Sequence, residues 1–187
     1  RKRRGELVSC FLFEMNDSLN DIAMGENIAM QLSKVGGGVA INLSKIRAKG
    51  ESIKNIANVT KGVVGVMKLL DHSFRYADQM GQRPGSGAAY LNIFHKDIDA
   101  FLETKKISAD EDVRVKTLSI GVVIPDKFIE LAREDKDAYL FYPYSVYKEY
   151  GEYLDEMNMS EMYDELADNP NVGIALRIGV SIHHVQG

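Results

Sequence analysis

The run Asp78-Gln-Met-Gly-Gln-Arg-Pro-Gly-Ser-Gly-Ala-Ala-Tyr-Leu91 decides how the surrounding chain folds, because it separates two types of secondary structure. Three glycines and one proline fall within residues 81–87 and cannot continue a helix. The residues before the run carry an apolar stripe at helical spacing, and those that end it are typical of a buried strand. The run is therefore either an ordinary helix-to-strand connection or a loop whose free backbone contacts a ligand.

The same alternation of helix and strand continues in both directions along the chain. The sequence predicts strands at residues 6–15, 39–43, 88–94, 118–124 and 138–142. It predicts helices at residues 19–34, 52–77, 97–104 and 126–135. Strands that alternate with helices are typical of βαβ units, so we expect an α/β fold with a parallel sheet or barrel.

The helix predicted at residues 52–77 has more apolar positions than one buried face needs. Its main stripe recurs at spacings of three and four, and the residues are Ile56, Val59, Val63, Met67, Leu70, Phe74 and Ala77. Val64, Val66 and Leu69 widen this stripe, and Gly62 and Gly65 would let another helix approach closely. We expect this helix to pack on the core with one side and on a neighbouring subunit with the other.

The composition excludes several classes of protein. The net charge is only −4, with 23 basic and 27 acidic side chains intermixed, so neither nucleic acid nor a membrane is expected as a partner. No apolar stretch approaches the roughly 20 residues that span a bilayer, and no secretory signal follows the basic residues 1–4. A single cysteine cannot form an internal disulfide, so we expect a cytoplasmic protein.

Several motifs follow one another in an order that is similar to a known family. They are Gly5-Glu-Leu-Val-Ser-Cys-Phe-Leu12, Asn16-Asp-Ser-Leu-Asn-Asp-Ile22, Gly37-Gly-Val-Ala-Ile-Asn-Leu-Ser-Lys-Ile-Arg-Ala-Lys-Gly50, Lys105-Lys-Ile-Ser-Ala-Asp-Glu-Asp-Val-Arg-Val-Lys116 and the tyrosine-rich residues 141–153. Together with residues 78–91, this series resembles the large, catalytic subunit of class I ribonucleotide reductase, and most closely its class Ib branch. The resemblance runs from about residue 5 to residue 172.

The resemblance implies a ten-stranded α/β barrel, of which residues 1–172 would supply the first strand–helix units as an internal part. The complete enzyme reduces ribonucleoside diphosphates to deoxyribonucleotides for DNA synthesis by thiyl-radical chemistry. Residues 173–187 depart from the family and are predicted to be a tail that arises from an interrupted gene, a frameshift or a truncation. Because the family's radical cysteine would lie beyond residue 172, we expect the chain alone to be inactive.

Cys10 has two interpretations. A free cysteine with apolar neighbours is, on sequence alone, typical of a small buried hydrophobic residue. The resemblance instead implies that Cys10 is one of the two redox-active thiols that deliver electrons to the substrate, with its partner absent from the chain. It also implies substrate binding by Ser9 and by the backbone of Gly37 and Gly38, which could approach a ribose or phosphate closely.

A second implied site binds an allosteric effector, a deoxynucleoside triphosphate or ATP, through Asp17, Ser18, Leu19 and Arg47 at a dimer interface. An arginine suits phosphate, and a carboxylate accepts a bond from a sugar hydroxyl. A specificity loop would relay the effector's identity to the substrate pocket, and its residues are Met80, Gly81, Gln82, Arg83, Pro84, Gly85, Ser86 and Gly87. Without the resemblance, Asp17 and Ser18 would be interpreted only as residues that cap a helix.

The resemblance also implies partners: a small subunit with a metal-radical cofactor, a dithiol reductant and a second copy of the large subunit. We expect this chain itself to bind no metal and no other cofactor. Two alternatives stay open, namely a non-catalytic module that binds nucleotide effectors and dimerises, or a functionless product of an interrupted gene. His95 and the tyrosines of residues 139–153 are expected to be structural.

Overall fold

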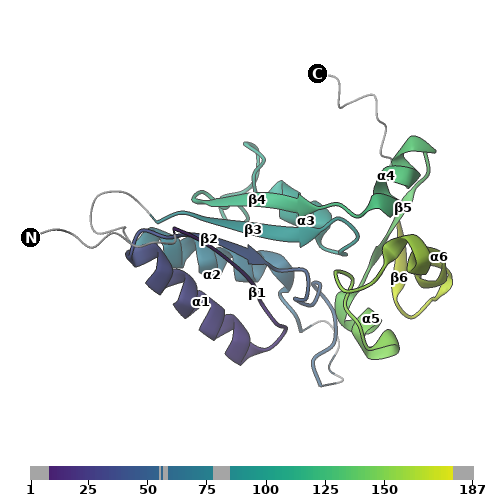
Figure 1. Ribbon diagram of the computed structural model, residues 1–187, viewed down its shortest axis with the longest axis horizontal. Coiled ribbons are helices and arrows are strands. Elements are labelled where there is room, and N and C mark those ends of the chain that lie inside the picture. The colour runs from purple at the N-terminus through teal and green to yellow at the C-terminus, as the bar shows by residue number, and fades with distance from the viewer. Residues whose placement is uncertain (1–8, 55, 57–58, 78–84, 179–187) are drawn as a thin grey trace, which may run out of the picture.

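The computed structural model describes residues 9–54, 56, 59–77 and 85–178 (Figure 1). Within these ranges no helix is both long and apolar enough to cross a membrane. A four-stranded sheet with helices on one face forms one part of the molecule, and a smaller group of elements follows beyond one end of its strands (Figure 1).

The sheet is parallel throughout and has the order β1-β2-β3-β4. Its strands are β1 (Cys10–Glu14), β2 (Gly38–Asn42), β3 (Gly87–Asn92) and β4 (Leu118–Val123). The parallel α/β sheet predicted from the sequence is thus confirmed. Neighbouring strands are joined by helical crossovers, as parallel pairs require.

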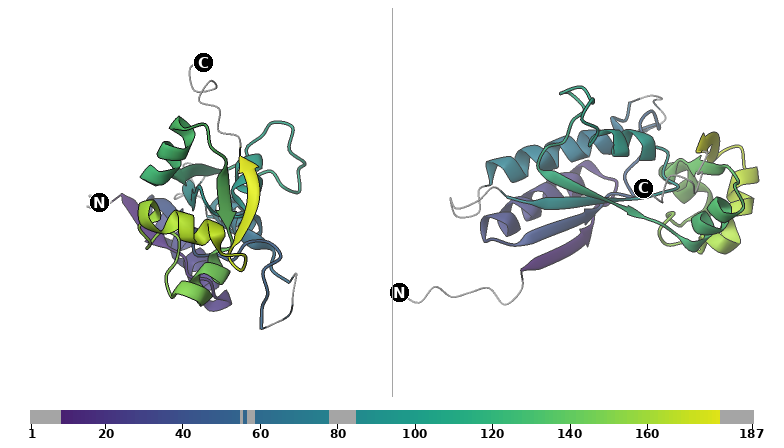
Figure 2. Two further views of the ribbon diagram at one scale, coloured as in Figure 1. Left: turned by 90° about the vertical axis from the view of Figure 1, so that its right-hand side faces the viewer. Right: turned by 90° about the horizontal axis from the view of Figure 1, so that it is seen from above.

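Three helices cover one face of the sheet: α1 (Leu19–Lys34), α2 (Gly62–Tyr76) and α3 (Ile98–Glu103) (Figures 1 and 2). The core lies between them and the sheet, where Val39 and Ile41 of β2 and Met67 and Phe74 of α2 are buried. The other face carries alternate residues such as Leu12 and Tyr90, which are exposed. One face of the sheet is therefore packed, and the other is open.

The helix α1 begins where the sequence predicts it. Ser18 is its N-cap, and the Ser18 Oγ accepts a hydrogen bond of 3.0 Å from the Asp21 backbone N–H. A hydroxyl in this position satisfies one of the free N–H groups of the first turn. Of the two capping residues that the sequence offered, Ser18 has this role, which leaves the Asp17 carboxylate for other partners.

The helix α2 is shorter than predicted, because the described residues within 52–61 are not helical. Lys54 and Gly62 have positive φ angles of 48° and 71°, which a right-handed helix does not allow. The apolar stripe is buried only from Val63 onward, whereas Ile56 and Val59 are 63% and 47% exposed. The spacing of apolar residues therefore predicted a helix start about one third of the segment too early, because α2 begins at Gly62.

Gly62 also has a different role from the predicted one. A Cβ atom there would lie 2.3 Å from the Asp97 Oδ2 and 2.8 Å from the Lys49 backbone N, so the close approach is to a loop and not to another helix. Leu69 is exposed on the outer side of α2, which agrees with an apolar surface on both sides of this helix.

The group beyond the carboxyl ends of the strands consists of five elements (Figure 1). They are α4 (Asp126–Arg133), β5 (Ala138–Phe141), α5 (Pro143–Tyr150), α6 (Met159–Asp168) and β6 (Gly173–Ile178). The strand β5 was predicted, but it pairs antiparallel with β6 in a separate two-stranded sheet. The sequence analysis missed α5, α6 and β6.

Main-chain bonds and aromatic packing join this group to the sheet. The Phe141 N–H donates to the Phe94 carbonyl at 2.7 Å, just after β3. The rings of Phe94, Phe141 and Tyr163 lie with their centroids 5.3 to 6.2 Å apart. Such offset and edge contacts stabilise a core beyond the area that they bury, so the group is fixed relative to the sheet.

Candidate functional site

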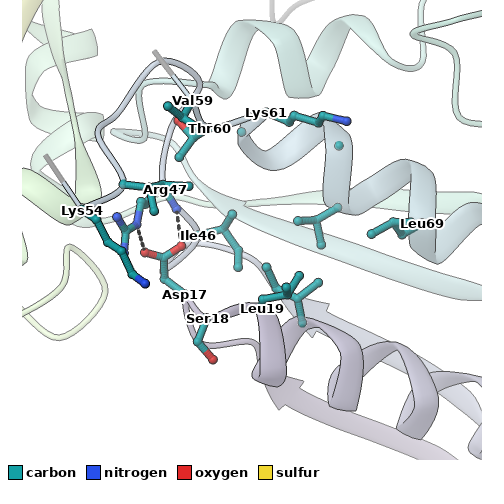
Figure 3. A pocket seen from close by; sticks show the side chains of 15 residues that line it. Asp17, Ser18, Leu19, Ile46, Arg47, Lys54, Val59, Thr60, Lys61 and Leu69 are labelled. Atoms are coloured by element: carbon teal, nitrogen blue, oxygen red, sulfur yellow. Dashed lines mark hydrogen bonds and ion pairs between the residues drawn. The ribbon is translucent and has the colours of Figure 1, made fainter. Parts of the chain in front are cut away.

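A pocket of about 750 Å³ lies where the chain leaves β1 and β2 and where α1 and α2 begin (Figure 3). Its lining residues come from the start of α1, the loop after β2 and the first turns of α2, and they are Asp17, Ser18, Leu19, Ile22, Ile46, Arg47, Ile53, Lys54, Val59, Thr60, Lys61, Gly62, Gly65, Val66 and Leu69. The four residues predicted to bind an effector are all in this set. The structure therefore brings Asp17, Ser18, Leu19 and Arg47 together.

Asp17 and Arg47 form the polar centre of this pocket (Figure 3). The Arg47 Nε donates to the Asp17 Oδ2, and the Arg47 backbone N–H donates to the Asp17 Oδ1 at 3.2 Å. The Arg47 Nη1 donates to the Ser52 carbonyl at 2.7 Å. These bonds hold the guanidinium in one orientation, which is a prerequisite for bidentate contact with a phosphate.

Burial raises the pKa of the Asp17 carboxyl above its ordinary value, and the hydrogen bonds and charge of Arg47 partly oppose this shift. The two side chains are 10% and 18% exposed, so the pair is largely shielded from water. A charge pair in such a place interacts more strongly than one at the surface.

The sequence analysis missed Lys54, Thr60 and Lys61, which also line this pocket. They lie within residues 52–77, which the sequence analysis predicted to be one helix, whereas in the structure Lys54 is in a turn and Thr60 and Lys61 precede the helix. The loop that actually forms places two further cationic side chains at the same pocket as Arg47. The signal in the sequence for a loop here is that a glycine stands at each end of the segment, namely Gly50 and Gly62.

The predicted specificity loop is only partly described. Met80, Gly81, Gln82, Arg83 and Pro84 lie outside the described residues, whereas Gly85, Ser86 and Gly87 lead into and start β3. This described part lies beyond the C-terminal end of α2, while the pocket lies at the N-terminal end of the same helix. The structure does not bring the described loop residues together with Asp17 and Arg47.

Gly85 and Gly87 are required by close packing and not by an unusual backbone conformation. Neither has a positive φ angle. A Cβ at Gly87 would lie 2.3 Å from the Phe74 ring, and one at Gly85 would lie 2.4 Å from the Ser33 Oγ and 2.6 Å from the Phe74 carbonyl oxygen. The structure thus gives these two glycines a packing reason, and their part in a specificity loop stays a prediction.

The second predicted site lies on the open face of the sheet. Cys10 of β1 is opposite Gly38 of β2 in the strand register, and the Gly38 N–H donates to the Ser9 carbonyl at 2.7 Å. Cys10 is an exposed free thiol, so its interpretation as a buried hydrophobic residue is wrong. The structure brings Ser9, Cys10 and Gly38 together.

A hollow of about 470 Å³ extends from Cys10 across this face. It is lined by residues of four neighbouring strands, and they are Cys10, Phe11, Leu12, Glu14, Ala40, Asn42, Tyr90 and Val123. Gly37 is turned away from it, because a Cβ there would lie 2.8 Å from the Phe11 ring and 3.1 Å from the Leu32 carbonyl oxygen. Gly37 thus has a packing role on the helix side, and only Gly38 borders the thiol.

His95 is structural, as predicted. It is fully buried, its Nδ1 accepts from the Asp97 N–H at 3.0 Å, and its Nε2 lies 2.8 Å from the Ile46 carbonyl. Burial lowers the pKa of His95. In the part of the chain that the structure describes, no group of three or more His, Cys, Asp or Glu residues could hold a metal ion.

Comparisons with known proteins identify the family of this chain. The family model described as "Ribonucleotide reductase, barrel domain" matches residues 8–181. The ribonucleoside-diphosphate reductase subunit alpha of Bacillus subtilis (strain 168) is 77% identical over 172 residues, which cover 92% of this chain and 25% of that protein. The subunit alpha of Mycoplasma pneumoniae is 47% identical over 172 residues and is covered to 24%.

A more distant relative is the ribonucleoside-diphosphate reductase large subunit of vaccinia virus, which is 35% identical over 142 residues. These residues make up 75% of this chain and 18% of the viral protein. The chain spans a quarter or less of the length of these curated relatives.

Proposed function

The chain belongs to the ribonucleotide reductase barrel-domain family, and from that membership we propose that it is part of the catalytic subunit of a ribonucleoside-diphosphate reductase. Its parallel sheet and covering helices are accordingly part of an α/β barrel, as the sequence predicted. The division into barrel residues 1–172 and a tail at 173–187 stays a prediction; residues 173–178 form β6.

The proposed reaction replaces the 2′-hydroxyl of a ribonucleoside diphosphate by hydrogen, using thiyl-radical chemistry. Two thiols supply two electrons and two protons, the C2′–O bond breaks, the oxygen leaves as water, and an S–S bond forms. Cys10 would be one of these thiols. The observation that carries the proposal is the exposed Cys10 on the open sheet face beside the Ser9–Gly38 main-chain contact.

The chain contains only this cysteine, so the second thiol must come from outside residues 1–187. A disulfide needs Cα atoms about 5.5 Å apart. The open face is the place where a further segment could bring such a thiol to Cys10. A separate small subunit with a metal-radical cofactor would start the reaction, and a dithiol reductant would restore the thiols.

We further propose that the pocket at Asp17 and Arg47 binds the effector, a deoxynucleoside triphosphate or ATP. Three cationic side chains line it, namely Arg47, Lys54 and Lys61, and they suit a triphosphate. The apolar side chains of Leu19, Ile22 and Leu69 suit a base. A volume of about 750 Å³ is within the range of small-molecule sites.

An effector in this pocket would reach the specificity loop of a second copy more easily than its own. The helix α2 has 15 residues, and with a rise of about 1.5 Å per residue it separates the two regions by about 20 Å. Two copies packed antiparallel through α1 and α2 would bring the pocket of one to the loop of the other. Leu19, Met24 and Leu69 are exposed on these helices and could form such a contact.

The test of the catalytic proposal is reduction of CDP by the native polypeptide with its radical subunit and dithiothreitol. We expect the Cys10→Ser variant to lose deoxycytidine diphosphate formation while it still binds nucleotide in the effector pocket. We expect residues 1–187 alone to be inactive, because one thiol cannot supply both electrons. Activity of the chain alone, or full activity of Cys10→Ser, would contradict the proposal.

A second candidate function is a non-catalytic module that binds nucleotide effectors and dimerises. It is favoured by one observation, namely that Asp17, Ser18, Leu19 and Arg47 line one pocket to which Cys10 does not contribute. Equilibrium dialysis with radioactive dATP and analytical ultracentrifugation would detect it. Binding and dimerisation by a chain that never joins a larger assembly would favour the module over the reductase.

A further inference from the structure

The side chain of Tyr144, at the start of α5, covers one face of the Arg47 guanidinium. The Arg47 Cζ lies 3.8 Å from the centre of the Tyr144 ring. Tyr144 comes from the group of elements beyond the carboxyl ends of the strands and does not line the pocket itself. An aromatic ring at this distance attracts a guanidinium by stacking and by its negative face.

The helix α5 is tied to the same loop at a second point. The backbone N–H and the Oγ of Ser145 donate to the Glu51 Oε1 at 3.1 and 3.2 Å. The other oxygen of Glu51 accepts from the Ala48 N–H at 2.7 Å, next to Arg47. Glu51 is buried, so these bonds are shielded from water. The position of Tyr144 relative to Arg47 is thus fixed by more than the stack.

We propose that Tyr144 is a positioning residue of the effector pocket, which holds the Arg47 guanidinium in the orientation that receives a phosphate. This inference rests on the proposed function of the pocket as a nucleotide site. Asp17 accepts from the Nε and the Ser52 carbonyl from the Nη1 of the guanidinium, and Tyr144 covers its face. The guanidinium then has one orientation before the ligand arrives, and less conformational freedom is lost on binding.

The same helix offers a matched control. Tyr147 lies one turn further along α5 and stacks on Tyr153, with ring centroids 4.4 Å apart and an angle of 12° between the rings. Replacement of Tyr147 by Leu removes an aromatic contact of α5 without touching Arg47. A general loosening of α5 would therefore affect Tyr147→Leu and Tyr144→Leu alike, whereas a positioning role is specific to Tyr144.

The experiment measures the affinity of dATP for the full chain and three variants by isothermal titration calorimetry. We expect Tyr144→Leu to weaken binding roughly tenfold, which is within the range of a cation–π contact. We expect Tyr144→Phe to restore the affinity of the original protein, because the ring is kept, and Tyr147→Leu to leave it unchanged. Equal weakening by Tyr144→Leu and Tyr147→Leu, or unchanged affinity in Tyr144→Leu, would overturn the inference.

A second measurement needs no ligand and so separates this inference from the proposed function. In an NMR spectrum of the free protein, the ring current of Tyr144 should shift the Arg47 Nε–H proton upfield. The shift should vanish in Tyr144→Leu and persist in Tyr144→Phe and Tyr147→Leu. If the original protein binds no dATP, the nucleotide site is wrong, whereas an Arg47 signal that is the same in all four proteins overturns the placement by Tyr144.

Discussion

The two candidate sites lie on one sheet but are built in different ways. The pocket at the carboxyl ends of β1 and β2 is held by side chains, with Arg47 bound to Asp17, Ser52 and Tyr144. The site around Cys10 consists of main chain, one exposed thiol and an uncovered sheet face. The geometry of the pocket is therefore fixed within this chain, whereas the face around Cys10 is complete only when something else covers it.

Three carboxylates explain why the pocket is so firmly held. They accept hydrogen bonds from three successive backbone N–H groups: Asp17 from Arg47, Glu51 from Ala48, and Asp97 from Lys49. The loop after β2 has no regular secondary structure at these residues, so its buried N–H groups need such partners. Around Cys10, by contrast, the hydrogen bonds of the described main chain run to the neighbouring strand β2.

Of the changes considered, removal of the Asp97 carboxylate should destabilise the protein most, because it loosens the loop that fixes the pocket. Asp97 is buried and accepts from the Lys49 N–H and from the Val63 N–H at the start of α2. We expect Asp97→Ala to lower the free energy of unfolding by about 3 kcal/mol, because the buried Val63 N–H and the part-buried Lys49 N–H lose their partner. Urea denaturation of the chain, followed by circular dichroism, measures this loss.

The exposed Asp99, on the same helix α3, provides the control for this change. We expect Asp99→Ala to cost less than about 1 kcal/mol, since it removes only a favourable charge at a helix start. Similar losses in the two variants would show that the loop after β2 does not depend on Asp97.

Substitutions of two glycines of the sheet should have smaller effects on stability, and they distinguish a glycine needed for packing from one needed for substrate binding. A Cβ at Gly87 would overlap the fully buried ring of Phe74, whereas the nearest atom to a Cβ at Gly38 is the Ser9 carbonyl oxygen at 3.6 Å. We expect Gly87→Ala to cost about 2 kcal/mol, as overpacked cores do. We expect Gly38→Ala to leave stability within about 0.5 kcal/mol but to weaken substrate binding.

Thermal unfolding and CDP binding to the native polypeptide distinguish these two outcomes. A stable Gly87→Ala variant would mean that Phe74 can move aside. Unchanged CDP binding in Gly38→Ala would argue against a close approach of the substrate to this strand.

The same two glycines illustrate what could be predicted from the sequence. The alternation of strands and helices was sufficient for the parallel sheet, and Ser18 was sufficient for the start of α1. The reason for Gly87 was not accessible, because contact with Phe74 depends on how α2 crosses the sheet. Periodicity describes which residues face the core, but not which neighbour each one meets.

The residues of the pocket, too, could be predicted only in part from the sequence. The resemblance supplied Asp17, Ser18, Leu19 and Arg47, and these residues do lie together. Lys54 and Lys61 were missed, because the apolar spacing of α2 continues into the residues before Gly62, where the backbone leaves the helix. Tyr144 could not be found at all from spacing, since its contact with Arg47 joins segments almost 100 residues apart in sequence.

The pH dependence of stability should differ between the two ends of the sheet. At the amino end of β4, the Asp71 Oδ1 accepts from the Thr117 N–H at 2.7 Å and from the Leu118 N–H at 3.2 Å. Burial would raise the pKa of Asp71, but these hydrogen bonds together outweigh it and hold the pKa below the ordinary value. In Asp17 and Glu51, by contrast, burial prevails and raises the pKa.

The sign for Asp71 follows from this lowered pKa. Its contribution to stability is present above the pKa of an unfolded Asp, about 3.9, and is lost as the pH falls through the folded pKa. We expect Asp71→Asn to cost about 1.5 kcal/mol at pH 7, with the difference from the original protein shrinking below about pH 4. Urea denaturation from pH 7 to pH 3 tests this, and a difference that grows on acidification would contradict it.

The smallest effect on stability is expected at the residue with the largest proposed effect on activity. Cys10 is exposed, and its Sγ has only a 3.9 Å contact with the Ser9 Oγ among the described hydrogen bonds. Cys10→Ser should therefore change the free energy of unfolding by less than about 0.5 kcal/mol. In the folded chain, iodoacetamide should modify this thiol as fast as in urea, because Cys10 is exposed. Slow alkylation that requires unfolding would mean that the face around Cys10 is already covered, and the contrast between a pocket fixed within this chain and an open thiol site would fail.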